Sequence, residues 1–169
     1  MAERISLRDY QRDLAARLRD ADAGRTASKL AVQAGNDGWL IDLQEAGEVI
    51  PVPPITAVAQ TRPWFKGVAN VRGNLYSVID FPAFLGGAGV ALGEQSRLLL
   101  IAPRYRVGAA LLVDASLGLR NPESWQPRET AQAPAAWQRA EYEDEAGKVW
   151  KELDVAELVK DQNFLTVGS

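Results

Sequence analysis

The sequence contains no cysteine and no histidine among its 169 residues. The missing cysteines exclude disulfides, a thiol nucleophile and thiolate metal ligation. The missing histidines exclude a Ser-His-Asp triad, a phosphohistidine and the histidine ligands of most zinc sites. A chain of this length can bury about 70% of its unfolded surface, so an apolar core is enough to hold a single domain together.

Long hydrophobic runs and a large charge imbalance are also lacking. The apolar stretch at residues 98–102 ends at Pro103 and is far shorter than the roughly 18 residues of a membrane span. The first four residues begin a charged segment rather than the apolar core of a signal peptide. The net charge of -3 gives no general attraction to nucleic acid or to an anionic membrane. We therefore expect a cytoplasmic protein with no direct membrane insertion and no nucleic-acid partner.

Apolar residues that recur at every second position predict strands over most of the chain. Leu30, Val32 and Ala34 form one such run, and a second begins at Trp39 after a Gly/Asn/Asp turn at residues 35–38. Prolines at positions 51, 53 and 54 favour an edge or a loop there. Further strand-like runs occupy residues 67–72, 75–80, 97–102, 106–113, 137–142 and 148–153, and residues 154–163 have helical spacing. Many short strands with few helices predict a mainly all-β barrel or sandwich.

Residues 6–20 are the exception, because Leu7, Tyr10, Leu14 and Leu18 recur at spacings of three and four. We therefore divide the chain into an N-terminal amphipathic helix with its linker, residues 1–24, and a β-rich domain, residues 25–169. A helix this short needs a packing partner for its apolar stripe. The short linker favours the outer face of the same chain's β-rich domain, and a groove on a partner is the alternative.

The most informative segment is a predicted hairpin within residues 63–80. Gly73 and Asn74 both tolerate positive φ, so we place the two-residue loop there, which pairs Arg72 with Leu75. In this register one face carries buriable side chains and is assigned to the core: Ala69, Val71, Tyr76 and Val78. The opposite face mixes large apolar side chains with an amide and a guanidinium, which is typical of a protein-docking surface. The candidate partner-binding residues are Val68, Asn70, Arg72, Gly73, Leu75 and Ile79.

Two of these candidates have a structural alternative. Asn70 and Arg72 can hold neighbouring loops through hydrogen bonds, as polar residues on strands usually do. Asp80, which ends the second strand just before a Phe-Pro pair, is assigned a turn or cap role rather than acid–base chemistry.

The segment from Gly67 to Gly73, followed by residues 78–80 (Val-Ile-Asp) and 85–86 (Leu-Gly), resembles the signature of CheW-like adaptor domains of bacterial chemosensory arrays. The resemblance extends over about residues 28–163. It implies two small five-stranded β-barrels that share a core, flanked by N-terminal and C-terminal helices, with no catalytic site and no cofactor. It also implies a scaffold that bridges the regulatory domain of a CheA-like histidine kinase to the tip of a methyl-accepting chemotaxis receptor. The N-terminal helix and the variants at residues 64–65 and 75–76 resemble most the adaptors of type IV pilus twitching systems.

Other chemistries fit these residues less well. A nucleic-acid-binding barrel is the alternative function, because small barrels of that kind combine exposed aromatic rings with basic side chains. The residues that suit it are Trp39, Arg62, Trp64, Phe65, Lys66, Arg72 and Tyr76. The glycines at positions 67 and 73 lack the following Lys-Ser/Thr of a phosphate loop, and the acidic cluster at residues 141–145 lacks calcium-loop spacing. We therefore expect no enzyme activity and no bound metal or cofactor.

Overall fold

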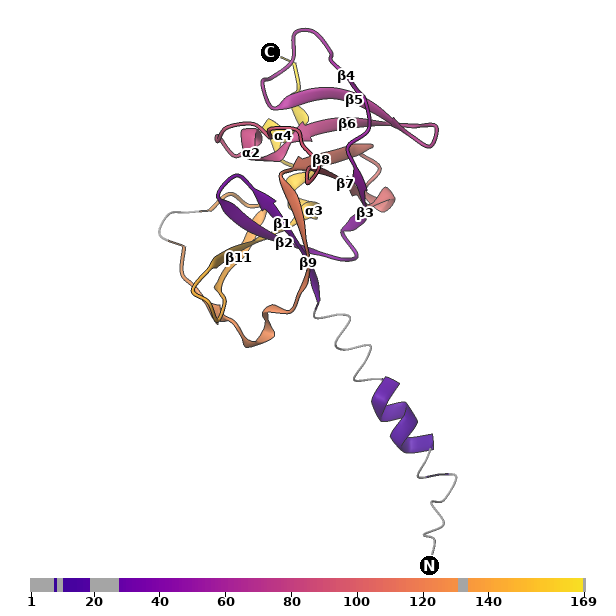
Figure 1. Ribbon diagram of the computed structural model, residues 1–169, viewed down its shortest axis with the longest axis vertical. Coiled ribbons are helices and arrows are strands. Elements are labelled where there is room, and N and C mark those ends of the chain that lie inside the picture. Colours follow the sequence, from indigo (N-terminus) through magenta and orange to yellow (C-terminus); the bar gives the residue numbers. More distant parts are fainter. Residues whose placement is uncertain (1–7, 9–10, 19–27, 131–133, 169) are drawn as a thin grey trace, which may run out of the picture.

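The computed structural model describes residues 8, 11–18, 28–130 and 134–168, and from residue 28 onward it is mainly β-structure. Two six-stranded sheets lie one above the other in Figure 1. The first sheet has the order β10-β11-β12-β2-β1-β9. Its strands are β1 (Lys29–Ala34), β2 (Asp37–Asp42), β9 (Ala115–Arg120), β10 (Gln126–Pro127), β11 (Gln138–Glu143) and β12 (Val149–Leu153).

The second sheet has the order β3-β7-β8-β6-β5-β4. Its strands are β3 (Ala46–Pro51), β4 (Ile55–Thr56), β5 (Phe65–Val71), β6 (Asn74–Asp80), β7 (Arg97–Ile101) and β8 (Ala109–Val113). Apart from the two-residue strands β4 and β10, each sheet consists of five strands. The expected mainly-β fold, with two barrel-like halves around a shared core, is confirmed.

The chain passes back and forth between the two sheets. Strands β1 and β2 belong to the first sheet, β3 to β8 to the second, and β9 to β12 to the first again. The last residues then return to the second half, where the Arg62 N–H donates to the carbonyl of Val167 and Thr61 forms a β-bridge with Gly168. Neither sheet is therefore a separate domain.

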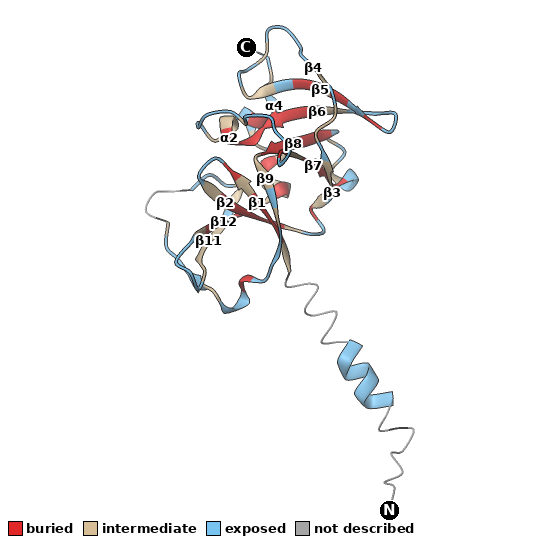
Figure 2. Ribbon diagram, viewed as in Figure 1, coloured by how far each residue is buried: buried red, intermediate tan, exposed pale blue. Residues whose placement is uncertain are grey.

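The central strands are apolar on both faces because each face meets a different cluster. In β7, Leu99 and Ile101 face the cluster shared by the two sheets, whereas Leu98 and Leu100 face the interior of the second sheet. Strand β8 alternates in the same way. In β1, Ala31 faces a third cluster inside the first sheet. Side chains on a strand alternate between faces, so these runs must be apolar at every position. Figure 2 shows the resulting buried layer between the sheets.

Short helices connect the strands, and an aspartate begins each of the three α-helices named here. They are α2 (Phe81–Phe84), α3 (Val155–Leu158) and α4 (Gln162–Leu165). The side chains of Asp80, Asp154 and Asp161 each accept a hydrogen bond from a backbone N–H in the first turn, which satisfies a donor that has no partner within the helix. The cap role expected for Asp80 is confirmed. The predicted helix at residues 154–163 was wrong in its continuity, since Asp161 starts a second helix.

Several strand boundaries differ from the prediction. Strand β3 lies at the edge of its sheet and ends at Pro51, which agrees with the edge alternative given for this segment. Strand β9 was not predicted, because it is mostly exposed and irregular at Gly118, whose φ is 79°. Strand β8 begins at Ala109 rather than at residue 106. A 3-10 turn at Pro103–Tyr105 precedes it, and Arg106 and Gly108 adopt left-handed conformations that interrupt a strand.

The N-terminal helix is described at residues 8 and 11–18, and Leu7 and Tyr10 lie outside the described residues. Leu14 and Leu18 are 46% and 59% exposed, so the expected packing of this stripe on the same chain's β-rich domain is not found (Figure 2). Within the described part of the chain, no helix is long and apolar enough to cross a membrane.

Gly67 marks the closest approach of β4 to β5. Its φ of 133° is a conformation that side chains other than glycine rarely adopt, and a Cβ there would lie 1.9 Å from the carbonyl oxygen of Thr56. The register also shifts here: Phe65 pairs with Ile79 and Gly67 pairs with Val78, which leaves one extra residue in β5. This bulge bends β5 over the end of its neighbour, so glycine is required at position 67.

We predict that Gly67→Ala lowers the free energy of unfolding by at least about 2 kcal/mol, because it adds both backbone strain and a clash with main-chain atoms. Urea unfolding monitored by tryptophan fluorescence measures the effect. The matched control is Gly93→Ala, whose new Cβ would meet nothing within 4 Å. It should change stability by less than about 0.5 kcal/mol. Equal stabilities for the two variants would contradict the role of Gly67.

Candidate protein-docking surface

The β5–β6 hairpin turns at Arg72 and Gly73. Both residues have positive φ, 52° and 86°, which is the pattern of a two-residue turn that matches the twist of its strands. Val71 pairs with Asn74, and Asn70 pairs with Leu75. The predicted loop at Gly73-Asn74 was therefore wrong by one residue. Arg72 lies in the turn itself rather than on the strand, and its side chain leaves the tip of the hairpin.

Asn70 stabilises this turn. Its Oδ1 accepts a hydrogen bond of 2.8 Å from the Gly73 N–H. This hydrogen bond thus stabilises the turn in which Arg72 has a positive φ, a conformation that an arginine adopts only with strain. The structural alternative considered for Asn70 is what the structure shows, with a turn N–H rather than a loop carbonyl as the partner.

Arg72 forms an ion pair with Glu48 of β3, the strand at the opposite edge of the same sheet, through its Nη2 and the carboxylate Oε2. The hydrogen bond that Arg72 donates to Glu48, together with the Glu48 charge, raises the pKa of Arg72. Both side chains are exposed, so the pair adds little to the stability of the fold. Its effect is to fix a guanidinium and a carboxylate side by side at the surface.

A shallow hollow of about 200 Å³ lies beside this ion pair. Its floor is the apolar edge of the second sheet, and its rim carries both charges. Besides Glu48 and Arg72, the lining includes Gly47, Tyr76, Leu100, Ile101 and Pro103. Apolar area next to a few oriented polar groups is the composition of the centre of a protein interface.

The remaining predicted residues divide between surface and core. Leu75 is 67% exposed near the tip of the hairpin, and Val68 is half-buried on β5. Ile79 is only 2% exposed and packs in the shared cluster, because the first sheet covers that end of β6. Placing Ile79 on the docking surface was therefore wrong. The surface around the hairpin tip, called the tip surface below, consists of Glu48, Asn70, Arg72, Gly73 and Leu75.

Glu48 was not among the predicted residues, although the sequence held a signal for it. Strand β3 places Glu48 and Ile50 on the same face, opposite Val49, but the nearby prolines favoured a loop. An alternating reading of residues 46–51 would have placed the Glu48 carboxylate on a strand, whose ion pair with the hairpin depends on the packing of the sheet.

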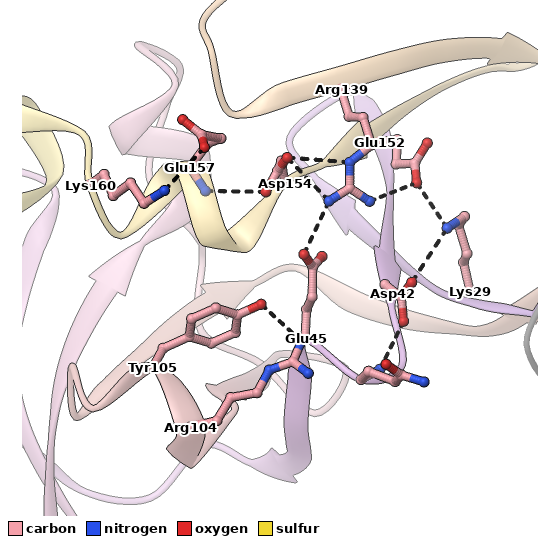
Figure 3. Close-up of polar contacts among 11 residues, drawn as sticks. Lys29, Asp42, Glu45, Arg104, Tyr105, Arg139, Glu152, Asp154, Glu157 and Lys160 are labelled. Carbon is pink, nitrogen blue, oxygen red and sulfur yellow. Dashed lines mark hydrogen bonds and ion pairs between the residues drawn. The ribbon is translucent and has the colours of Figure 1, made fainter.

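A second polar cluster, also unpredicted, joins the first sheet to the connection that leads into the second (Figure 3). Arg139 of β11 contacts Glu45 at 3.1 Å, Asp154 at 3.1 Å and Glu152 at 3.4 Å, and Lys29 contacts Glu152 at 2.8 Å. Burial acts to lower the pKa of Arg139, but its hydrogen bond to Asp154 and the three carboxylate charges outweigh burial and raise it. The cluster places basic side chains beside buried carboxylates, so we assign it to structure.

The tip of the β11–β12 hairpin is organised by Asp144. Its carboxylate accepts hydrogen bonds of 2.9 Å from the backbone N–H groups of Ala146 and Lys148 and from the indole of Trp150. The indole bond, then the backbone bonds and the charge of Lys148, lower the pKa of Asp144. Residues 144–147 form the turn of this hairpin. No group of residues in the described part of the chain forms a candidate metal site.

The basic and aromatic residues that would suit nucleic acid do not form an open surface. Trp39 is buried, Lys66 lies 3.7 Å from the carboxylate of Asp80, and Arg72 is paired with Glu48. Lys66 and Arg72, two of the basic residues that would bind a nucleic-acid phosphate, therefore already lie beside carboxylates.

Comparison with known proteins identifies the family. A sequence model of the CheW-like domain matches residues 29–163. The chain belongs to the CheW-like family. PilI of Pseudomonas aeruginosa is 34% identical over 117 residues, which are 64% of this chain and 65% of that protein. The chemotaxis protein CheW of Klebsiella aerogenes is 29% identical over 54% of this chain and 56% of that protein.

The CheW of Thermotoga maritima is 29% identical over 59% of this chain and 64% of that protein. The chain therefore spans less than two thirds of the length of each of these relatives. Among solved structures, the scaffolding protein TtCheW of Thermoanaerobacter tengcongensis matches with a TM-score of 0.62 at 18% identity. That match covers 76% of this chain and 88% of that one, and it shows the same fold.

We predict that Asn70→Ala destabilises the protein by about 1 kcal/mol, because the Gly73 N–H loses its acceptor in the turn. Asn70→Asp keeps an oxygen acceptor and should lose less. Thermal unfolding of both variants measures the difference. Equal losses would show that the amide acts in some way other than as an acceptor.

We predict a pH-dependent loss of order at the Asp144 hairpin. Because the folded-state pKa lies below the ordinary value of 3.8, the contribution of Asp144 is fully present above that pH and is lost as the pH falls through the lowered pKa. The NMR signal of the Trp150 indole N–H, followed on acidification, reports it. In Asp144→Asn the hairpin should already be less stable near neutral pH, and the difference from the natural protein should shrink in acid. A constant difference at all pH values would contradict the assignment.

Proposed function

We propose that this CheW-like protein is a non-catalytic adaptor that couples methyl-accepting chemotaxis receptors to a CheA-like histidine kinase in a cytoplasmic chemosensory array. The observation that carries the proposal is the tip surface, where an exposed arginine and an exposed leucine stand beside an apolar hollow on a CheW-like fold. This surface combines three features that suit protein recognition: apolar area, an oriented ion pair and a rigid turn.

The similarity to PilI supports a role in twitching motility driven by type IV pili. We propose that output, with the tip surface facing the receptor and the kinase regulatory domain bound elsewhere on the two sheets. No step of this function needs a nucleophile or a general base. The buried carboxylates Asp80 and Glu152 contact backbone N–H groups and basic side chains of the same chain, which supports a structural role for both.

The proposal makes Arg72 a contact with an acidic receptor surface. We predict that Arg72→Glu weakens binding of a receptor cytoplasmic tip at least tenfold, because reversed charges repel across the interface. Isothermal titration calorimetry measures the affinity, and thermal unfolding verifies that the variant is folded. The matched control is Arg128→Glu, which reverses another exposed arginine paired with a glutamate, on the first sheet. It should bind the receptor as the natural protein does.

The double variant Arg72→Glu/Glu48→Arg distinguishes two explanations for weaker receptor binding: loss of a direct contact by Arg72, or loss of its ion pair with Glu48. It restores an ion pair of opposite polarity between the hairpin and β3. If Arg72 contacts the receptor, binding stays weak in the double variant. Recovered binding would show that only the internal ion pair matters. Full receptor binding by a folded Arg72→Glu variant would contradict the proposed contact, and unfolding of that variant would assign Arg72 to structure.

A further inference from the structure

A row of aromatic rings crosses the junction of the two sheets, away from the tip surface. Its members are Trp39 in β2, Trp137 before β11, Phe84 in α2 and Trp64 before β5, with successive ring centroids 5.8, 5.8 and 5.2 Å apart. Trp39 is buried, whereas the other three are half-buried and reach the surface. Hollows of about 420 Å³ and 260 Å³ flank Trp137. We call this row with its two hollows the aromatic groove.

One polar atom beneath the groove has no partner. The indole nitrogen of Trp39 is buried and has no hydrogen-bond acceptor among the described residues. Trp39 lines the larger hollow together with Trp137 and Lys151. Buried donors in folded proteins nearly always have acceptors, so an incomplete set at a groove floor indicates a surface that a further chain segment completes.

The N-terminal helix has the complementary composition. Leu14 and Leu18 are exposed and one helical turn apart, so they recur about every 6 Å along the axis, close to the spacing of the rings. Residues 11–18 carry two arginines and one aspartate, with Arg17 paired to Asp13 at 3.0 Å. The groove lining has the opposite balance, with three carboxylates against two basic groups: Asp37, Glu141, Asp161, Arg62 and Lys151.

We propose that residues 11–18 of one copy dock in the aromatic groove of a second copy, with Leu14 and Leu18 on the exposed rings. A second copy is the occupant because, in the single chain, both leucines remain exposed beside an unfilled groove. The ten-residue step from residue 18 to residue 28 spans at most about 35 Å when extended, which is sufficient to reach a neighbouring molecule. Helix and groove are different surfaces, so each contact is head-to-tail, and reciprocal contacts close a pair whereas successive ones build a ring or an open chain.

The size of the contact sets its strength. A two-turn helix covers less area than the interfaces of stable complexes, so the association is weak and depends on a high local concentration of copies. A scaffold protein crowded into an array would meet that condition. This inference concerns self-association alone and needs neither a receptor nor a kinase.

Disulfide cross-linking tests the proposal cleanly, because the natural chain has no cysteine. Ala15→Cys puts a thiol beside the leucine stripe, and Ala135→Cys puts one in the lining shared by both hollows. Differently tagged full-length chains that carry one substitution each are mixed and oxidised. We expect the heterodimer to form at least fivefold faster than with Gly93→Cys, a site in open space, in place of Ala135→Cys.

A second substitution shows whether the leucine stripe causes the cross-link. Leu14→Asp in the Ala15→Cys chain should remove the heterodimer, whereas Ala16→Asp, which adds the same carboxylate on the opposite side of the helix, should leave it. A heterodimer rate equal to the Gly93→Cys control, or one unaffected by Leu14→Asp, would overturn the proposal. A chain that carries both cysteines and forms only an internal disulfide would also overturn it, since the helix would then occupy its own groove.

Discussion

The two-sided burial of the central strands governs the rest of this structure. From Leu98 to Ile101 in β7 and throughout β8, every side chain meets an apolar cluster, the odd positions toward the other sheet and the even positions toward the interior of their own. No polar chemistry fits at such positions, since an unpaired polar group there costs several kcal/mol. Functional groups are therefore confined to hairpin tips, edge strands and the junction between the sheets. The tip surface and the aromatic groove lie at two of these places.

The buried carboxylates are each compensated by a nearby hydrogen-bond donor or basic side chain. Asp80 accepts hydrogen bonds from Ala83 and Val90, so it begins α2 and fastens the glycine-rich loop that follows. Glu152 faces Lys29 and Arg139. Glu45, on the connection between the sheets, faces Arg139 through one oxygen, and its other carboxylate oxygen has no partner among the described residues. Buried charge here ties neighbouring elements of the fold to one another.

The sequence pattern was sufficient for features set by local rules. Alternation located the β5–β6 hairpin, and a Phe-Pro pair after Asp80 identified a cap. The pattern failed where neighbours decide the outcome. Residue preference placed the loop at Gly73 and Asn74, but the pairing of β5 with β6 gives Arg72 a positive φ with the help of Asn70. Ile79 has the alternation of a surface residue, and only the presence of the other sheet buries it.

The candidate site shows the same division between local and long-range information. Arg72 and Leu75 could be found because they belong to one hairpin with a recognisable signature. Their partner Glu48 is 24 residues away in an edge strand, so no local spacing connects it to the hairpin. The cluster around Arg139 contains the contact of Arg139 with Glu45, 94 positions away, and the still longer-range contact of Lys29 with Glu152. Contacts of that range come from the packing of the sheets, which a single sequence does not specify by pattern.

The interleaved course of the chain has a mechanical consequence. Lys29 enters the first sheet, paired with strands on both sides, whereas the last described residue, Gly168, is bridged to Thr61 in the second half. A pulling force applied between Lys29 and Gly168 therefore acts across the apolar layer that the two sheets share. Strand pairs in the first sheet would be loaded lengthwise, and the layer between the sheets would resist their separation. A protein held between two large assemblies can thus transmit displacement from one to the other as a single stiff body.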